Sequence, residues 1–338
     1  MTFYKTFKQF FTRLKIALML VVLSASRPVY GGQAVMEGVM MKGTHCYVTT
    51  VRTSEGYKRQ LKPHRSLTKR YKSLRIPIIR GMIVLIETFS IGYKSLTYSS
   101  EVALEEENKK QREENGSKDK MSKESDDDPD SSLGDQLLIW GSVAVGIVFA
   151  IGLFKFLPLL AAKSVDSLFN VSDMVFNIVD GVFKGGIFIL YMVIVGRLPD
   201  IKELFRYHGG EHKTINCMDA GEKLSVRNIS KHSQEHLRCG TTFMFLVLFM
   251  SILVYLFIPK DLPFLINFGL RLALVPFIAG ISYELQRFGA LYSKGFGKIV
   301  LRPGLWLQSL SVNTPSPKHI RPARLSLQEA MKYDKKNS

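Results

Sequence analysis

The chain has 338 residues, enough for about two domains, and 46% of them are hydrophobic. Its formal net charge is +17 and its pI is about 9.7, a basic balance that also occurs in nucleic-acid-binding proteins. Here the charge coexists with long apolar runs and with no compact basic and aromatic module, so we exclude nucleic acid as a partner and expect the cytoplasmic loops of a membrane protein.

Residues 1–30 are basic and then briefly apolar. The apolar run from Ile16 to Leu23 has eight residues, too few to cross a bilayer. With basic residues before it and Ser24-Ala25-Ser26 after it, the segment resembles a signal peptide. Translocation would carry the basic stretch that follows to the outside, against the usual charge bias. We therefore predict a membrane-surface anchor for residues 1–30.

Residues 31–75 are predicted to form a small cytoplasmic α/β domain. The glycine-rich stretch Gly31–Gly38 suggests a turn followed by a strand. Two short β-like runs, residues 47–52 and 57–61, flank Ser54–Gly56, which has the composition of a hairpin turn.

Two segments connect this domain to the rest of the chain. Residues 76–98 are apolar but contain Arg80 and Glu87, whose spacing of seven places both charges on one helical face. We predict an interfacial or membrane-dipping helix there. Residues 99–134 are predicted to be a disordered acidic linker, because residues 101–130 carry twelve acids, six bases and almost nothing apolar.

Residues 135–286 are predicted to form a four-helix transmembrane domain. Each of four apolar runs approaches the about 20 residues that a helix needs to cross a bilayer core. They cover roughly residues 137–162, 174–196, 241–258 and 264–285.

The basic residues around these runs predict their orientation. The His-rich loop of residues 197–240 carries eight Lys or Arg and the basic tail of residues 287–338 carries ten, whereas the other two loops are short and nearly uncharged. The positive-inside bias makes that loop and both termini cytoplasmic. The prediction is an α-helical integral membrane protein with about four transmembrane helices, a small cytoplasmic α/β N-terminal domain, and the lipid bilayer as a partner.

Three charged residues lie inside the apolar runs: Asp180, Lys184 and Arg271. Charges within a membrane are costly and usually pair. We predict that Asp180 pairs with Arg271 or with Lys184 and thereby locks the bundle. A transport path is the alternative, but these few charges are insufficient for it.

The sequence His208-Gly-Gly-Glu211-His212 lies in the predicted cytoplasmic loop. On a helix, a spacing of four would place both imidazoles on one face, as a metal ion requires. Glu211 can act as a general base or as a ligand in this order, which is that of inverted metallopeptidases. The two glycines argue against a stable helix and leave a turn as an alternative. The alternative without a metal site is a pair of solvated loop histidines.

A second cluster repeats this spacing: His232-Ser-Gln-Glu235-His236, followed by Cys239. Cys239 directly precedes the third apolar run, and a position near a helix N-terminus favours thiolate, the form that binds metal. The alternative is a small interfacial cysteine beside two solvated histidines. The three cysteines form no CxxC pair, which indicates a reducing compartment. Glu284, at the cytoplasmic end of the fourth run, can complete the metal site or pair as an ordinary helix-end acid.

Several segments together resemble the YqhQ family of bacterial membrane proteins. They are Gly31–Met41, Arg75–Pro77 with Arg80 and Gly81, Tyr207–Lys213, His232–Thr241 and Pro303–Gln308. The resemblance covers most of the chain outside the acidic linker and about the last twenty residues. It implies the bacterial plasma membrane, a domain of unknown function and a predicted metal-dependent enzyme, with motif positions at His208, Glu211, His212, His232, His236 and Cys239.

We expect a metal-dependent hydrolase that acts on a membrane-associated substrate, such as a lipid or a membrane peptide, at the cytoplasmic face. His208 and His212 would bind a divalent metal, zinc in the first place and iron as an alternative. Glu211 would activate water. The remaining ligands would come from His232, His236, Cys239 and Glu284. The alternative is a non-catalytic assembly or partner-binding protein with a structural metal.

Overall fold

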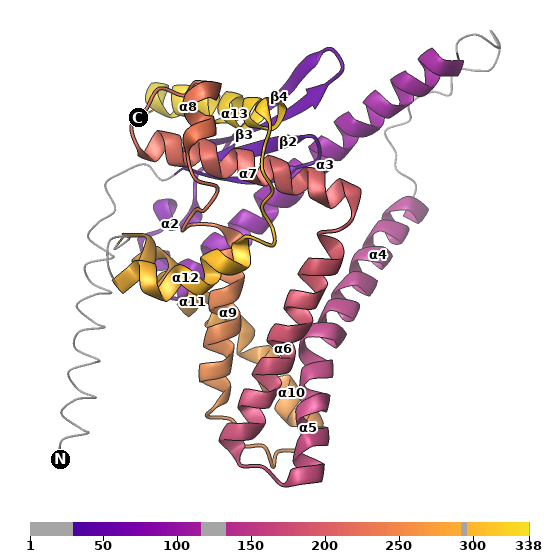
Figure 1. Ribbon diagram of the computed structural model, residues 1–338, viewed down its shortest axis with the longest axis vertical. Coiled ribbons are helices and arrows are strands. Elements are labelled where there is room, and N and C mark those ends of the chain that lie inside the picture. Colours follow the sequence, from indigo (N-terminus) through magenta and orange to yellow (C-terminus); the bar gives the residue numbers. More distant parts are fainter. Residues whose placement is uncertain (1–29, 116–132, 292–295, 338) are drawn as a thin grey trace. The chain divides into compact units, whose positions relative to one another are not determined.

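The computed structural model describes residues 30–115, 133–291 and 296–337 (Figure 1). The predicted anchor over residues 1–30 lies outside the described residues except for Tyr30, and so do residues 116–132 of the predicted linker. The chain forms two compact units. The sheet unit consists of Met1–Leu104, Met192–Met250 and Pro276–Ser338. The helical unit consists of Glu105–Tyr191 and Ser251–Val275.

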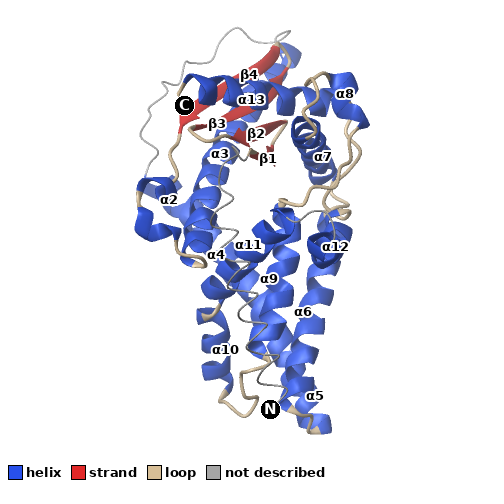
Figure 2. Ribbon diagram, turned by 90° about the vertical axis from the view of Figure 1, so that its left-hand side faces the viewer, coloured by secondary structure: helices blue, strands red, loops and turns tan. Residues whose placement is uncertain are grey.

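A four-stranded antiparallel meander forms the N-terminal part of the sheet unit (Figure 2). Its strands follow one another in the order of the chain: β1 (Gly31–Val35), β2 (Gly38–Lys42), β3 (Cys46–Thr53) and β4 (Gly56–Pro63). The strands predicted over residues 47–52 and 57–61 and the hairpin turn between them are confirmed, with Thr53 paired to Gly56. The turn predicted at the start of Gly31–Gly38 is wrong, because β1 begins at Gly31 and the turn follows Val35. At Gly56 the backbone φ is +136°, a conformation that favours glycine.

Both faces of the sheet are covered by helices, which explains why consecutive residues of its central strands are buried. On one face, residues such as Val39, Met41 and Val48 form a core with side chains of α7 (Pro199–Asp219) and α13 (Pro317–Lys336). On the other face, Met40 and Tyr47 pack against Ile91 of α3 (Ile79–Asn115). Successive residues of a strand point to opposite faces, so both sets are buried.

The C-terminal segment is part of this fold and not a separate tail. Helix α12 (Phe296–Gln308) is followed by α13, which is held to the sheet by hydrogen bonds. Ser326 Oγ donates to the Val39 carbonyl at 2.8 Å, and the Asp334 carboxylate accepts from the backbone N–H groups of Thr44 and His45 at 2.7 and 2.8 Å. The small domain predicted over residues 31–75 is therefore completed by residues near the end of the chain.

Helix α3 includes the helix predicted over residues 76–98 and extends into the predicted disordered linker. It follows α2 (Leu67–Arg70) and a short 3-10 turn (Lys72–Arg75), and its first turns pack on the sheet unit. Arg80 pairs with Glu284, and the Glu87 carboxylate accepts a hydrogen bond from Ser66 Oγ at 2.8 Å. The two charges that suggested a membrane surface are thus satisfied inside the protein. Residues 99–115, within the predicted linker, continue the same helix.

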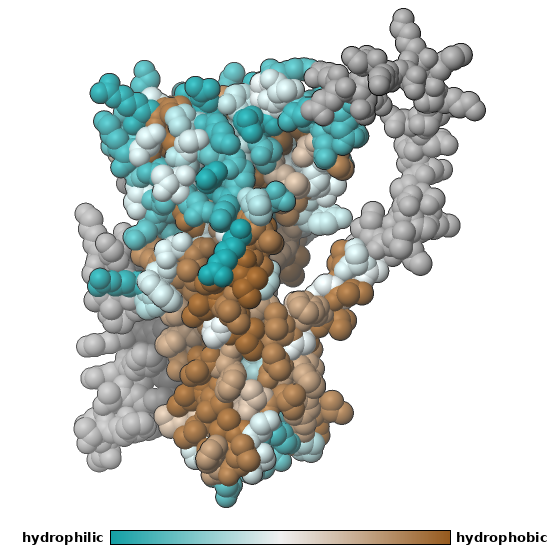
Figure 3. Space-filling view, turned by 45° about the vertical axis from the view of Figure 1, so that its right-hand side comes forward, coloured by the Kyte–Doolittle hydropathy of each residue, from teal (hydrophilic) through white to brown (hydrophobic). Residues whose placement is uncertain are grey.

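Within the described residues, three helices are long and apolar enough to cross a membrane, which indicates a membrane protein. Figure 3 shows the apolar side chains on the surface of this part of the molecule. Gly141–Phe169 combines α4 (Leu133–Ile151), a π-helical turn (Gly152–Phe156) and α5 (Leu157–Phe169). The others are α6 (Asp173–Val195) and Phe264–Ala290, which combines α10 (Phe264–Ala273) with most of α11 (Val275–Leu291). The remaining predicted run corresponds to α9 (Gly240–Tyr255), a shorter apolar helix of 16 residues.

The charged residues within the apolar helices of the helical unit form one network, as predicted. Asp180 Oδ2 accepts hydrogen bonds from Lys184 Nζ at 2.9 Å and from Arg271 Nη1 at 2.5 Å. The Arg271 guanidinium also donates to the side-chain oxygens of Asn177 and Asn267. All five residues are buried. Each nitrogen of the guanidinium therefore has an acceptor, which offsets the cost of placing it among apolar helices.

Candidate metal centre

Helix α7 carries the first histidine motif despite its two glycines. A Cβ added at Gly210 would lie 2.7 Å from the His319 carbonyl oxygen of α13, so only glycine allows the two segments to approach this closely. Packing against α13 thus overrides the low helix propensity of the glycines. The helical periodicity then places His208, Glu211 and His212 close together.

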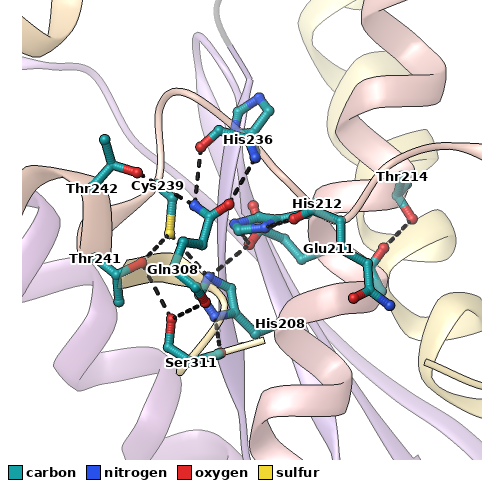
Figure 4. A network of polar contacts seen from close by, with 12 residues as sticks. His208, Glu211, His212, Thr214, His236, Cys239, Thr241, Thr242, Gln308 and Ser311 are labelled. Atoms are coloured by element: carbon teal, nitrogen blue, oxygen red, sulfur yellow. Dashed lines mark hydrogen bonds and ion pairs between the residues drawn. The ribbon is translucent and has the colours of Figure 1, made fainter. Parts of the chain in front are cut away.

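Backbone carbonyls orient both imidazoles of α7 (Figure 4). His208 Nδ1 lies 2.8 Å from the Ser311 carbonyl oxygen, and His212 Nδ1 lies 2.6 Å from the Gln234 carbonyl oxygen. A carbonyl oxygen only accepts hydrogen bonds, so each Nδ1 must carry the proton and donate it. In the neutral rings this leaves both Nε2 lone pairs free to bind a ligand, the arrangement that metal-binding histidines adopt.

Cys239 meets these histidines from a distant part of the chain. Its Sγ lies 3.3 Å from His208 Nε2 and 3.1 Å from Thr241 Oγ1. Among the described residues, His208, His212 and Cys239 are one of two groups whose metal-binding atoms all lie within 4.8 Å of one another. Cys239 directly precedes α9 and is 5% exposed, so the thiol is held at the start of an apolar helix.

Cys239 and His208 shift each other's pKa. Burial by itself raises the pKa of the Cys239 thiol, but the charge of His208 and hydrogen bonds from His208 and His212 hold this pKa well below its usual value. Burial by itself lowers the pKa of His208, but Cys239, Glu211 and the Ser311 carbonyl outweigh it and raise the pKa to about 9. Without metal, the contact therefore favours the thiolate of Cys239 together with the imidazolium of His208.

Glu211 places a buried carboxylate beside the histidines. Its Oε2 lies 3.7 Å from His212 Nε2 and 3.9 Å from His208 Nε2, and the residue is 4% exposed. Strand β1 makes room for it, because a Cβ added at Gly32 would lie 2.7 Å from Glu211 Cγ. This explains a glycine in the N-terminal stretch that sequence reasoning had interpreted only as a turn.

His236 lies next to this group but has partners of its own. The centre of its ring is 5.5 Å from that of His212, and its Nε2 lies 3.9 Å from Asp219 Oδ2. Gln308 holds the His236 backbone, since its Oε1 accepts from the His236 N–H at 2.9 Å and its Nε2 donates to the His236 carbonyl at 3.1 Å. Sequence reasoning missed Gln308 and Ser311, because residues that act through backbone groups leave no chemical signature.

The other two predicted ligands lie with different partners. His232 belongs to the second metal-capable group, with Cys217 and Glu222. Glu284 forms two hydrogen bonds with the Arg80 guanidinium and is in neither group. The structure therefore brings together His208, Glu211, His212 and Cys239, with His236 beside them.

The donor set fits a zinc ion. Nitrogen and sulfur atoms bonded to a tetrahedral zinc at about 2.0–2.3 Å lie about 3.5 Å apart. The separation of His208 Nε2 and Cys239 Sγ, 3.3 Å, is close to this value. A thiolate together with imidazoles is also the set that zinc prefers over harder cations.

Residues 76–333 match the family described as "Protein of unknown function (DUF1385)". The chain belongs to this family. It is also 31% identical over 323 residues to a protein of Bacillus subtilis (strain 168) described as "Uncharacterized protein YqhQ", an alignment that covers 91% of this chain and 93% of that one. No solved structure matches the chain. The family match includes α7, the second histidine cluster and α12, and so every residue of the candidate metal centre.

Cys239 is expected to be the first of the three cysteines to react with iodoacetamide in protein stripped of metal by a chelator. Its reaction rate should depend less on pH between about pH 6 and about pH 8 than the rates of the other two, because the pKa of its thiol is held well below the usual value. Burial raises the pKa of Cys46 to about 12 and also raises that of Cys217, so their rates should rise with pH. Peptide mapping by mass spectrometry measures the three rates, and faster labelling of Cys46 or Cys217 at the lower pH would contradict the assignment.

Proposed function

We propose that the protein is a metal-dependent enzyme, a zinc hydrolase with His208, His212 and Cys239 as ligands. The observation that carries this proposal is the orientation of the two imidazoles, whose Nδ1 atoms are bound to carbonyls while a thiolate and a carboxylate lie on the Nε2 side. Ordinary solvated histidines do not need this combination. His236 is the candidate for a further ligand, by its position beside His212.

The chain supplies a base at the right place for hydrolysis. A zinc ion, when bound, supplies Lewis-acid chemistry, which lowers the pKa of water toward neutrality and polarises the bond to be cleaved. Glu211 Oε2 accepts the proton from the attacking water and later returns it to the leaving group. The Ser311 and Gln234 carbonyls keep the rings of His208 and His212 in one tautomer throughout.

A membrane-associated substrate at the cytoplasmic face of a bacterial plasma membrane is part of this proposal. Cys239 directly precedes the apolar helix α9, so the site lies where the chain passes from polar to apolar sequence. The eight basic residues of the loop over residues 197–240 favour a cytoplasmic position by the positive-inside bias. A lipid or a membrane peptide is the substrate that such a site would reach.

A structural metal site in a non-catalytic assembly protein is the second candidate. The observation that favours it is burial: His212, Glu211 and Cys239 are 1%, 4% and 5% exposed. Closed four-ligand sites are typical of structural zinc, whereas a catalytic site keeps an open position. The two candidates differ in what Glu211 does, because only a catalytic site needs its carboxylate as a base.

Metal analysis of the purified full-length protein tests the ligands. We expect bound zinc in the wild type and its loss in His212→Ala and Cys239→Ala, because each variant removes one of three donors. Absence of zinc from the wild type would eliminate both candidates. Zinc that persists at this site in both variants would show that the ligands are others.

The variant Glu211→Gln separates the enzyme from the structural site. It should keep the zinc and lose activity by about 10²–10⁴-fold, the usual contribution of a general base. Activity is measured by untargeted mass spectrometry of bacterial membrane extracts incubated with vesicles that contain the protein. The matched control is Glu235→Gln, an exposed carboxylate in the neighbouring loop, which should leave the products unchanged. Identical products from wild type and Glu211→Gln would favour the structural site.

A further inference from the structure

A second group of metal-binding side chains lies near the C-terminal end of α7. Metal-binding atoms of Cys217, Glu222 and His232 all lie within 4.8 Å of one another. Cys217 is in the last turn of α7, and Glu222 is in the connection that follows. His232 directly follows α8 (Val226–Lys231). Three separate segments thus bring a sulfur, an oxygen and a nitrogen donor to one point.

The facing atoms of His232 and Glu222 need a proton or a metal cation between them. His232 Nε2 is buried with no hydrogen-bond partner among the described residues, and Glu222 Oε2 lies 3.3 Å from it. A carboxylate only accepts hydrogen bonds, and so does Nε2 in a neutral ring protonated at Nδ1. Two such lone pairs repel each other unless a proton or a metal cation lies between them.

Cys217 favours the metal cation over a proton. A proton on His232 Nε2 would satisfy Glu222 but would give no part to the Cys217 sulfur, which lies within 4.8 Å of metal-binding atoms of both residues. The Cys217 thiol donates a long hydrogen bond of 3.8 Å to the Lys223 carbonyl oxygen. A thiolate, an imidazole and a carboxylate are together the ligands of zinc, which would displace the thiol proton on binding.

The backbone of the connection is already fixed for such a site. Lys213 Nζ donates to the carbonyls of Ser230 and His232, and Asn216 Nδ2 donates to those of Ser233 and Glu235 at 2.8 and 2.9 Å. Because α7 holds both sides of His232 in this way, little conformational entropy is lost when a metal binds.

We propose that Cys217, Glu222 and His232 form a second metal site, which takes zinc and fastens the connection between α7 and Cys239. This site does not depend on the proposed hydrolase activity. It has a consequence for the first centre, because the connection includes Gln234, whose carbonyl orients the His212 ring. Occupation of the second site therefore stabilises the acceptor that keeps His212 in its metal-binding tautomer.

Zinc stoichiometry of the full-length protein tests this proposal. After dialysis against zinc buffered by a chelator, the wild type should hold two equivalents and Glu222→Gln one. The Glu222 side chain is 47% exposed, so its replacement should leave the fold intact, which size-exclusion chromatography in detergent checks. The matched control is Glu235→Gln, an exposed carboxylate of the same connection that is in neither metal-capable group, and it should hold two.

Two further variants separate this proposal from the proposed function. His232→Ala should lose the same equivalent as Glu222→Gln, whereas His212→Ala should lose the other. If the wild type holds one equivalent and both Glu222→Gln and His232→Ala keep it, the second site is overturned and the first remains. If the wild type holds one equivalent that His212→Ala keeps and Glu222→Gln loses, the second site is established and the proposed function is refuted. Wild-type stoichiometry in both Glu222→Gln and His232→Ala would also overturn the second site.

Discussion

Replacing Arg271 by alanine is expected to destabilise the helical unit by about 3–5 kcal/mol, the usual cost of removing one partner from a buried ion pair. The substitution leaves Asp180 with Lys184 as its remaining cation and deprives Asn177 and Asn267 of the donors for their side-chain oxygens. The Arg271→Lys variant should recover only part of the loss, because an ammonium group cannot reach three acceptors with the geometry of a guanidinium. Thermal unfolding in detergent measures the effect.

The control and the rescue for this prediction come from the same unit. Lys163→Ala removes an exposed cation of α5 and should change stability by less than about 1 kcal/mol. The double variant with Arg271→Ala and Asp180→Asn should be more stable than Arg271→Ala alone, since it no longer buries an underpaired carboxylate. Equal stability of wild type and Arg271→Ala would show that the network contributes nothing to the fold.

Replacing Gly210 by alanine is expected to destabilise the sheet unit by about 1–3 kcal/mol, as overpacking does. The added Cβ would lie 2.7 Å from the His319 carbonyl oxygen and 3.0 Å from the carbonyl carbon, so α7 and α13 must move apart. Because α7 also carries His208 and His212, zinc affinity should fall together with stability. Unfolding in detergent and titration with a fluorescent zinc chelator measure the two effects.

The matched substitution is Gly186→Ala in α6, where an added Cβ meets no atom within 4 Å. Alanine is the better helix former by about 1 kcal/mol, so this variant should be as stable as the wild type or slightly more stable. The opposite changes in stability expected for Gly210→Ala and Gly186→Ala separate a packing requirement from helix propensity. If Gly210→Ala were stabilising as well, the close approach of α7 to α13 would be wrong.

Local patterns were sufficient to predict the apolar helices and the hairpin of β3 and β4. The apolar runs corresponding to Gly141–Phe169, α6 and Phe264–Ala290 are long, and the β-like residues of β3 and β4 flank a turn at Ser54–Gly56. The pairing of Asp180 with Arg271 and Lys184 could be predicted because charges among apolar helices need partners.

Contacts between distant segments could not be predicted in this way. The amphipathic pattern of α13 shows an apolar face but not the surface on which it packs, so residues 287–338 resembled a free basic tail. Arg80 suggested a membrane surface because its partner, Glu284, is far away in the chain. A single sequence contains no signal that joins such positions.

The same limit applies to the candidate metal centre. Residue type and spacing indicated His208, His212 and Cys239, which the structure places together. They also indicated His232 and Glu284, because a sequence shows which side chains can bind metal but not the direction in which each one points. The partner of His232, Cys217, was overlooked since its apolar neighbours suggest an ordinary core residue.

The packing of α13 on the sheet has a consequence for biogenesis. The apolar face that contains Val39, Met41 and Val48 is made early, but the helix that covers it consists of residues near the end of the chain. At about 5–20 residues per second, a ribosome needs on the order of ten seconds to one minute to reach that helix. During this interval the nascent domain exposes part of this apolar surface. A stop codon before α13 would therefore leave this face of the sheet without one of the two helices that cover it.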